Sequence, residues 1–368
     1  VAQGQPTGFS EGATLESYFS QFNYNYDGTY FLSASVRTDG SSRFINDKWG
    51  VFWSVGGSWI ASNESFLENS NFLSYLKLKA SYGVLGDQEG VDFFQSADTF
   101  NVTNLNDGLS ISERANGNPD LTWEESQMFQ TGVELSLNRY LDVNVDYYIK
   151  NTENLFFNRR VGSSQGISSI TVNDGVLRNT GLEFSVTGHL IQSENATLDL
   201  TINGEHIDNE ITTMPIEPST GEPRIIDTSP AFFGYSRGRS IFDFFLREYA
   251  GVDPDTGVSL WNQYFDDGNG NGTLDDGEAS IDNLTQYLND NPNANIASQT
   301  TTNYGAATLR YVDKSAIPTL RGAFRLAGSY KNFSLAAQFT YQFGGWAHDT
   351  KYSELMNEIG RASCRERV

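Results

Sequence analysis

The stretch FLSASVRTDGSSRF, residues 31–44, alternates apolar and polar side chains until it reaches Asp39-Gly40. Its apolar positions are Leu32, Ala34 and Val36, and the polar positions between and after them are Ser33, Ser35 and Arg37. Successive side chains of a β-strand point to opposite faces, so the alternation predicts a strand with one apolar and one polar face. Whether the apolar face meets a protein core or lipid depends on the rest of the chain.

The composition favours an all-β, turn-rich protein, because Phe, Tyr and Gly are frequent (25, 18 and 35 residues of 368) and Met is rare, with 3. The net charge of −22, from 46 acids and 24 bases, argues against nucleic acid as a partner, since phosphates are bound by clusters of Lys and Arg. The sequence has no run of about 18 apolar residues and therefore predicts no transmembrane helix. Strands of about 9–11 residues also span a membrane, and half of their residues are polar.

Alternating segments recur along the chain as about twelve strands, many of them longer than the usual length of about 5–6 residues. Short turns are predicted at Asp27-Gly28, Asn138-Arg139, Gln192–Asn195 and Lys331-Asn332. Long polar loops are predicted at Asp87–Leu121, Asn151–Asp174, Asn209–Ser240 and Asp266–Ile317. Short turns at one end of the strands and long loops at the other are typical of outer-membrane β-barrels, whose long loops lie outside the cell.

The last predicted hairpin, residues 320–343, has one apolar and one polar face. The apolar face carries Leu320, Phe324, Leu326, Tyr330, Phe333, Leu335, Ala337, Phe339, Tyr341 and Phe343; the other carries Arg321, Arg325, Ser329, Ser334, Gln338, Thr340 and Gln342. Aromatic residues lie toward the ends of such faces, as in the girdles of membrane barrels. A soluble β-sandwich also alternates, but strand length, loop pattern and girdles favour a barrel. We predict an all-β fold, an antiparallel transmembrane β-barrel with long extracellular loops, over residues 1–357.

The last eleven residues, EIGRASCRERV at 358–368, differ from the rest of the chain. They hold three Arg and the single cysteine, Cys364, and they do not alternate. One reading frame of a common sequencing adapter encodes these residues in the same order, so we interpret 358–368 as a non-native tail; the alternative is a basic C-terminus. The chain opens without Met or an apolar signal segment, and we expect it to come from the middle of a longer protein.

The sharpest local motif is DGNGNGTLDDGE, residues 267–278, within the loop predicted at 266–317. It fits the calcium-loop pattern D-x-[DN]-x-[DN]-G-x5-E. The ligand positions are Asp267, Asn269, Asn271, Thr273 through its carbonyl, Asp275 and Glu278. Calcium takes about 6–8 oxygen ligands, which a short loop of this kind supplies, and Gly272 allows the sharp turn. The alternative is a solvated acidic turn, because the upstream flank SLWNQYF predicts a strand rather than the helix of an EF-hand. Ca²⁺ is the one cofactor that the sequence suggests.

Other candidate residues give weaker signals. Bases expected on the inner, polar face are Arg37, Lys77, Lys79, Arg321 and Arg325, which either contact a substrate or pair with acids along a wet wall. The three histidines, His189, His206 and His348, are scattered without the spacing of metal ligands. The sequence contains neither a GxSxG nor a P-loop motif. It therefore predicts no enzymatic activity.

Several segments resemble the C-terminal half of a SusC/RagA-like TonB-dependent transporter. They are LESYFSQFNYNYDGTYFLSASVRTDGSSRF (15–44), KWGVFWSVGGSWIASNESFL (48–67), LKLKASYGVLGDQEG (76–90), NPDLTWEESQMFQTGVELSL (118–137) and FRLAGSYKNFSLAAQFTYQFGGWAHDTKYSELM (324–356). The resemblance runs from Leu15 to Met356 in consistent order. It implies a 22-stranded barrel plugged by an N-terminal domain, so that this chain would hold about twelve of the strands without the plug, the TonB box, and the first and last strands.

The resemblance also implies a function. Members of this family import nutrients, usually oligosaccharides or peptides, across the outer membrane of Gram-negative bacteria, with energy from the TonB complex and with a SusD-like surface lipoprotein as partner. The barrel wall would contact outer-membrane lipid. Two alternatives stay open: another TonB-dependent receptor, for a siderophore or cobalamin, and a soluble calcium-binding β-protein with an adhesive or structural role.

Overall fold

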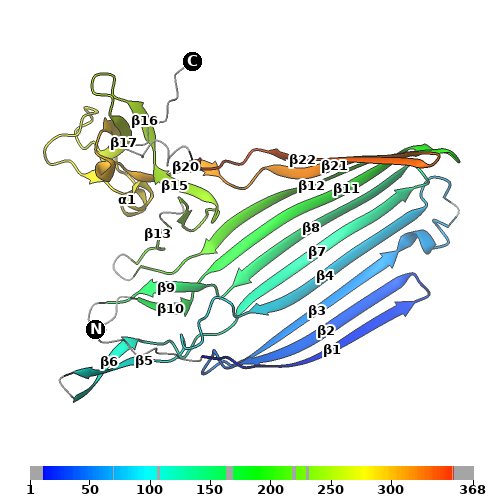
Figure 1. The fold of residues 1–368 in the computed structure, drawn as a ribbon, viewed down its shortest axis with the longest axis horizontal. Helices are drawn as coiled ribbons and strands as arrows, with labels where there is room; N and C mark the ends of the chain where they lie inside the picture. Colours follow the sequence, from blue (N-terminus) through cyan, green and yellow to red (C-terminus); the bar gives the residue numbers. More distant parts are fainter. Residues whose placement is uncertain are drawn as a thin grey trace, which may run out of the picture.

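The computed structural model describes residues 11–68, 70–105, 108–162, 169–217, 221–228, 232–349 and 351, so the adapter-like tail at 358–368 lies outside the described residues. Within them, the main element is a ten-stranded antiparallel sheet whose strands follow one another in chain order (Figure 1). Its strands are β1 (Leu15–Tyr26), β2 (Tyr30–Ser41), β3 (Trp49–Ile60), β4 (Tyr75–Asp87), β7 (Glu124–Leu137), β8 (Leu141–Glu153), β11 (Val176–Gln192), β12 (Ala196–Thr213), β21 (Leu320–Tyr330) and β22 (Phe333–Phe343).

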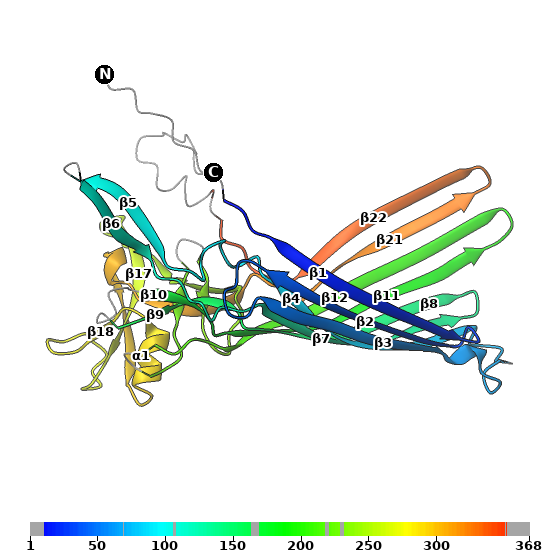
Figure 2. The same ribbon diagram turned by 90° about the horizontal axis from the view of Figure 1, so that it is seen from below.

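The sheet has the dimensions of a membrane-spanning wall. Its strands hold 11 to 18 residues, so each is long enough to cross a bilayer, which takes about 9–11 residues. Figure 2 shows the sheet bent into an open trough with β1 and β22 as its free edges. Among the described residues no helix is long and apolar enough to cross a membrane.

The strand count differs from the sequence prediction of about twelve. The weaker predicted pair around AGVDPDTG does form strands, β16 (Tyr249–Val252) and β17 (Ser259–Asp266), but they pair with each other in a separate small sheet. Their alternation resembles that of the other strands, and alternation says nothing about which sheet a strand joins. Ten of the expected strands therefore line the trough in the described part of the chain.

The predicted short turns are present at one end of the sheet. Asp27 and Gly28 adopt positive φ angles of 54° and 63°, and the N–H of Thr29 donates to the carbonyl of Tyr26 at 3.0 Å. Asn138 and Lys331 have φ angles of 51° and 52° in the corresponding turns. Gly, Asn and Asp tolerate this region best, which accounts for the sequence of three of these four positions.

The long connections lie at the other end of the sheet and fold by themselves (Figure 1). One holds the hairpin of β5 (Thr99–Leu105) and β6 (Gly108–Ala115), and another holds β9 (Phe156–Arg160) and β10 (Ser169–Asn173). The loops predicted separately at Asn209–Ser240 and Asp266–Ile317 are two parts of a single connection between β12 and β21. This connection also contains β13 (Ile226–Asp227), β14 (Gly234–Tyr235), β15 (Asp243–Arg247), β18 (Ser280–Ile281), α1 (Leu284–Asp290), β19 (Ile296–Thr301) and β20 (Leu309–Ser315).

A buried hydrophobic cluster lies where the strands meet the long connections. Its members are Phe44, Phe52, Val84, Val91, Leu121 and Trp123. The indole of Trp123 contacts the rings of Phe44 and Phe52, at centroid distances of 5.3 and 5.5 Å. The apolar face of the sheet leaves many large side chains open, such as Phe333 and Leu335, each at 80% exposure. A sheet that exposes so much apolar surface is suited to a bilayer rather than to water.

Aromatic residues lie at both ends of the apolar face, as the sequence predicts. Near the short turns, the rings of Tyr30 and Trp59 stack with an interplanar angle of 2° at 6.4 Å. Near the long connections, Tyr18 and Trp49 stack at 6.3 Å. Tyr and Trp favour the two interfaces between lipid and water, so these two groups set the level of the bilayer on the wall.

We expect residues 11–351 expressed alone to fail to form a heat-resistant monomer in membranes. The free edges of β1 and β22 would place unpaired backbone groups in lipid, at a cost of several kcal/mol each. Electrophoresis of unboiled samples measures this, because closed barrels keep a compact mobility in detergent, and a known closed barrel serves as the control. A compact, heat-resistant species embedded in the membrane would contradict the expectation.

Candidate functional site

Strand register brings polar residues into continuous rows across the trough. In one row the residues opposite one another on successive strands are Ser58, Lys79, Gly132, Asp146, Glu183, Glu205, Arg321 and Gln342, called here the charged row. The adjacent row on the other face is Trp59, Leu78, Val133, Val145, Phe184, Gly204, Gly322 and Tyr341. The predicted separation of a polar and an apolar face therefore holds across these eight strands.

Most charges of the charged row are paired. The Lys79 ammonium lies 3.0 Å from Asp146 Oδ1 and 3.3 Å from Glu134 Oε1. The Asp146 side chain is 8% exposed, so it depends on this cation for compensation. At the other end of the row, the Arg321 guanidinium pairs with Glu205. The carboxylate of Glu183, between Asp146 and Glu205, makes no hydrogen bond or ion pair with another described residue.

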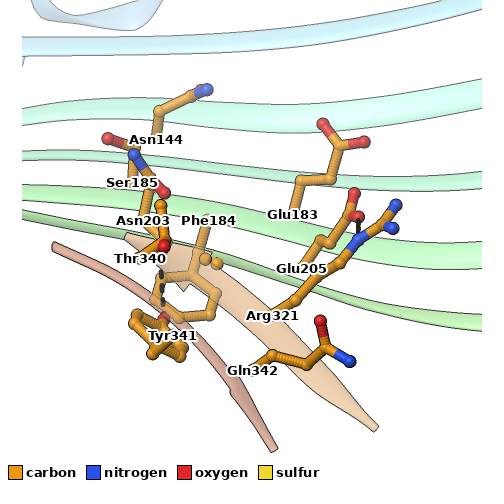
Figure 3. Close-up of a pocket in the computed structure, with 12 residues that line it drawn as sticks. Asn144, Glu183, Phe184, Ser185, Asn203, Glu205, Arg321, Thr340, Tyr341 and Gln342 are labelled. Atoms are coloured by element: carbon orange, nitrogen blue, oxygen red, sulfur yellow. Dashed lines mark hydrogen bonds and ion pairs between the residues drawn. The ribbon is translucent and has the colours of Figure 1, made fainter. Parts of the chain in front are cut away.

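A polar hollow of about 590 Å³ lies beside Glu183 (Figure 3). Glu183, Glu205 and Arg321 contribute charges of both signs to its lining. Amide and hydroxyl groups come from Asn144, Ser185, Asn203, Thr340 and Gln342. In Figure 3 the charged side chains extend from neighbouring strands on the same side of the sheet. Such groups hydrogen-bond to polar solutes, and the hollow offers no nucleophile paired with a base.

The bases predicted on the polar face are mostly paired. Arg37 lies 2.7 Å from Asp39, Lys77 lies 3.4 Å from Glu134, and Lys79 and Arg321 are paired as described above. Arg325 makes no ion pair within the part of the chain that the structure describes. The interpretation as paired charges along a wet wall therefore applies to four of the five residues.

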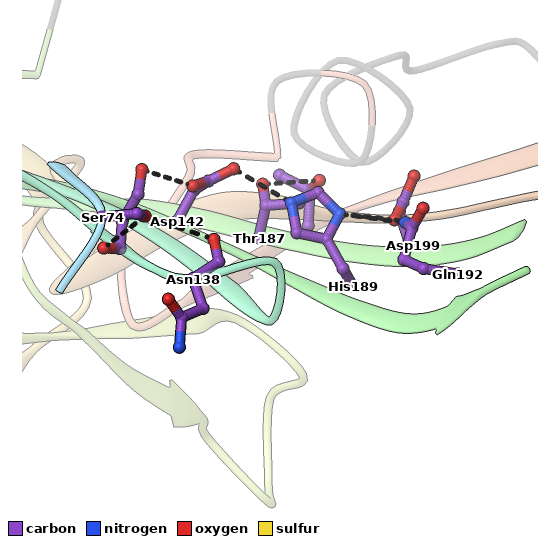
Figure 4. Close-up of polar contacts among 9 residues, drawn as sticks. Ser74, Asn138, Asp142, Thr187, His189, Gln192 and Asp199 are labelled. Atoms are coloured by element: carbon purple, nitrogen blue, oxygen red, sulfur yellow. Dashed lines mark hydrogen bonds and ion pairs between the residues drawn. The ribbon is translucent and has the colours of Figure 1, made fainter. Parts of the chain in front are cut away.

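His189 occupies a network that sequence spacing did not reveal (Figure 4). Its Nδ1 lies 2.7 Å from Asp199 Oδ1 and its Nε2 lies 3.0 Å from Asp142 Oδ2. Each ring nitrogen has to donate to a carboxylate, which favours the doubly protonated imidazolium. The three residues come from β11, β12 and β8, and the network links these strands beside their short turns. The sequence did contain one indication of this network, because alternation places His189, Asp199 and Asp142 on the polar face of their strands.

The calcium-like motif at 267–278 wraps around its first residue. Asp267 is 4% exposed, and its carboxylate accepts the backbone N–H groups of Gly270, Asn271 and Gly272 at 2.8, 3.1 and 2.8 Å. These hydrogen bonds fold the loop around the Asp267 side chain, which is the first ligand position of the calcium-loop pattern. Among the described residues, which include this motif, no three His, Cys, Asp or Glu side chains are grouped so that they could hold a metal ion.

The other candidate ligands of the motif hydrogen-bond to one another. The amides of Asn269 and Asn271 donate to Asp275 Oδ2 at 2.9 and 2.6 Å, and these bonds lower the pKa of the Asp275 carboxyl. Thr273 donates through its N–H and hydroxyl to Asn271 Oδ1, at 2.8 and 2.7 Å. Glu278 Oε2 accepts the N–H of Asp275, whereas its Oε1 is sealed from solvent and has no partner among the described residues. Calcium binding at this motif stays a prediction.

Comparison with known proteins identifies the family. The sequence profile described as "TonB dependent receptor-like, beta-barrel" matches residues 2–221. The chain belongs to this family. It is therefore an outer-membrane β-barrel receptor, and the predicted fold class and location are confirmed. The expectation that it is not an enzyme is confirmed by the same comparisons, which return receptors and importers.

Individual relatives of the receptor support a SusC/RagA-like assignment. TonB-dependent receptor P39 of Formosa agariphila is 34% identical over 210 residues, covering 55% of this chain and 20% of the relative. TonB-dependent receptor SusC of Bacteroides thetaiotaomicron is 29% identical over 293 residues, covering 75% and 29%. The structure of the RagAB peptide importer in its open-open state matches with a TM-score of 0.72 and 29% identity, covering 91% and 33%. The chain thus spans about a third or less of the length of these relatives.

We expect Lys79→Met to destabilise the receptor by about 1–3 kcal/mol. This is less than the cost of breaking a fully buried pair, because the Lys79 side chain is 28% exposed. Urea titrations of the full-length receptor in lipid vesicles, followed by tryptophan fluorescence, measure the change. The double variant Lys79→Met/Asp146→Asn removes both charges and should lose less stability than Lys79→Met alone. An equal or larger loss in the double variant would contradict the role given to the pair.

Proposed function

We propose that the receptor is part of a nutrient importer that takes up oligosaccharides or peptides across the outer membrane. In this proposal the TonB complex supplies the energy and a SusD-like surface lipoprotein is the partner. The observation that carries the proposal is the likeness to the RagAB peptide importer over 91% of this chain at 29% identity. The 29% identity to SusC supports the same assignment.

The described part of the receptor supplies a wall and extracellular connections to such an importer. The polar face presents many separate hydrogen-bonding groups, both charged and neutral, from the charged row and the hollow beside Glu183. Contacts of this kind exchange readily with water, so a polar solute is held weakly enough to move on. An import route needs this property more than it needs a single tight site.

The charges and amides of the polar hollow suit either class of solute. The Arg321 guanidinium and the Glu183 carboxylate complement the charged termini and side chains of peptides. The amides of Asn144, Asn203 and Gln342 donate and accept, as sugar hydroxyls require. Growth experiments on defined nutrients distinguish peptides from oligosaccharides as the imported solute.

We expect deletion of the gene to abolish growth of its bacterium on one class of polymer while growth on the monomers continues. Restoring the full-length receptor should restore growth, whereas a version without its TonB-binding segment, or a strain without the SusD-like lipoprotein, should not grow. Loss on a polysaccharide would assign oligosaccharides, and loss on protein would assign peptides. Normal growth on all polymers, together with a defect under iron or cobalamin limitation, would instead favour a siderophore or cobalamin receptor.

We further propose that residues 267–278 bind Ca²⁺ in the connection between β12 and β21. The solvent-sealed Oε1 of Glu278 supports this, because it has no hydrogen-bond partner among the described residues. The uncharged residues Asn269 and Asn271 lower the ligand charge, so we expect the weak affinity of extracellular modules, with Kd of about 10⁻⁴–10⁻³ M.

Calorimetric titration of the full-length receptor with Ca²⁺ tests this site. Glu278→Gln should weaken binding at least about tenfold, because it removes one charge and the bidentate ligand. Asp276→Asn is the matched control, since Asp276 lies in the same loop outside the ligand positions. Absence of binding heat in the unmodified receptor, or equal effects of the two substitutions, would favour the solvated acidic turn.

A further inference from the structure

A hollow interrupts the apolar face near the short turns of β11, β12, β21 and β22. In one row the opposite residues are Ile191, Leu198, Gly328 and Leu335. Three of them carry large aliphatic side chains, and Gly328 carries none. The gap belongs to a hollow of about 590 Å³. Its floor is therefore strand backbone whose groups are already paired within the sheet.

The surroundings of the hollow are apolar and open outward. Leu326 and Ala337 lie on its side toward the middle of the strands, and Tyr330 and Phe333 lie on its side toward the turn. Leu335, Phe333 and Tyr330 are 80%, 80% and 60% exposed, so no described part of the chain covers the hollow. The opening is on the face that a barrel of this family turns toward lipid.

The position of the hollow places it in the inner leaflet. It lies beside the turns at Gln192–Asn195 and Lys331-Asn332, and short turns of outer-membrane barrels are periplasmic. Water fills such a space poorly, because a bound water molecule needs about 2–4 polar partners and this lining presents mainly apolar atoms. The hydroxyls of two lining residues, Thr197 and Ser329, hydrogen-bond to each other. A hydrocarbon chain fills it without leaving a polar group unpaired.

A cation lies at the edge of the hollow. The Lys331 ammonium is 5.4 Å from the centroid of the Tyr330 ring, which places it beside the apolar face rather than the polar one. The N–H of Lys331 donates to the carbonyl of Asn195 at 2.8 Å, which fixes the turn against β12. Lys331 makes no ion pair with a described residue. A lysine that extends from a turn to headgroup level attracts a phosphate.

We propose that this hollow binds one glycerophospholipid of the inner leaflet, with an acyl chain over Gly328 and the phosphate next to Lys331. The proposal rests on the outer-membrane location of the receptor and not on its transport substrate. Another apolar row also contains glycines, but the Tyr341 side chain lies over both Gly204 and Gly322, whereas Gly328 belongs to the open hollow.

Native mass spectrometry of the full-length receptor, extracted from outer membranes in mild detergent, tests the proposal by counting retained phospholipids. Ala337→Phe places a ring in the hollow from β22, because Ala337 belongs to its lining. Gly328 is less suitable for substitution, because a Cβ there would lie 3.2 Å from Leu198 Cδ1 and from the Thr197 carbonyl. Ala80→Phe is the matched control, since Ala80 is opposite Gly57 on the same apolar face but lies outside the hollow.

We expect the unmodified receptor and Ala80→Phe to retain about one phospholipid per protein, and Ala337→Phe to retain at least about fivefold less. Retention by Ala337→Phe equal to that of the unmodified receptor, or an equal loss in Ala80→Phe, would overturn the assignment of the hollow. Phospholipid retention is measured without any transport. A negative result in the growth assay would therefore leave this test of the hollow unaffected.

A second pair of variants tests the phosphate contact. Lys331→Glu should lower retention at least about threefold, because it replaces the attractive charge by a repulsive one. Arg139→Glu is its control, since Arg139 lies 5.4 Å from the ring of Tyr140 at another short turn, away from the hollow. Unchanged retention in Lys331→Glu, or the same loss in both variants, would overturn the role of Lys331.

Discussion

The register of the backbone hydrogen bonds between neighbouring strands is the constraint on which the rest of the structure depends. A shift of one residue would turn every side chain of a strand to the other face, placing Lys79 and Asp146 in lipid and Leu78 and Val145 in water. The described register is continuous over most of the sheet. Between β11 and β12 it shifts at His189/Ile191, and this irregularity directs His189 to the polar face and Ile191 to the apolar one.

Both candidate sites on the wall follow from this register. The charged row exists because polar positions of different strands are opposite one another, and the lipid hollow exists because Gly328 falls in a row of aliphatic residues. The energetic terms differ on the two faces. Charges on the polar face are compensated by each other and by water, whereas the apolar face depends on lipid, since the described sheet has no second layer packed against it.

Much of the wall was predictable from the sequence, and the reasons are local. The faces of β2, β7, β8, β21 and β22 follow from period-two alternation, and the turns at Asp27-Gly28, Asn138-Arg139 and Lys331-Asn332 follow from residues that tolerate positive φ or interrupt alternation. The pair β16 and β17 was assigned to the wrong sheet because an alternating strand in a folded loop resembles one in a wall. Lys77, Lys79 and Arg321 were found without their partners, since Glu134, Asp146 and Glu205 come from other strands.

The sequence by itself determined the alternation, the strand lengths, the short turns and the calcium-like motif, because each of these is written in neighbouring residues. The tertiary structure decided which residues of distant segments meet: the charged row, the ring of His189 between two carboxylates, the single connection between β12 and β21, and the hollow over Gly328. These depend on which strands pair and in what register. Strand pairing depends on backbone hydrogen bonds that form between strands across the whole sheet. A short stretch of sequence does not contain the partner strands and therefore does not specify this pairing.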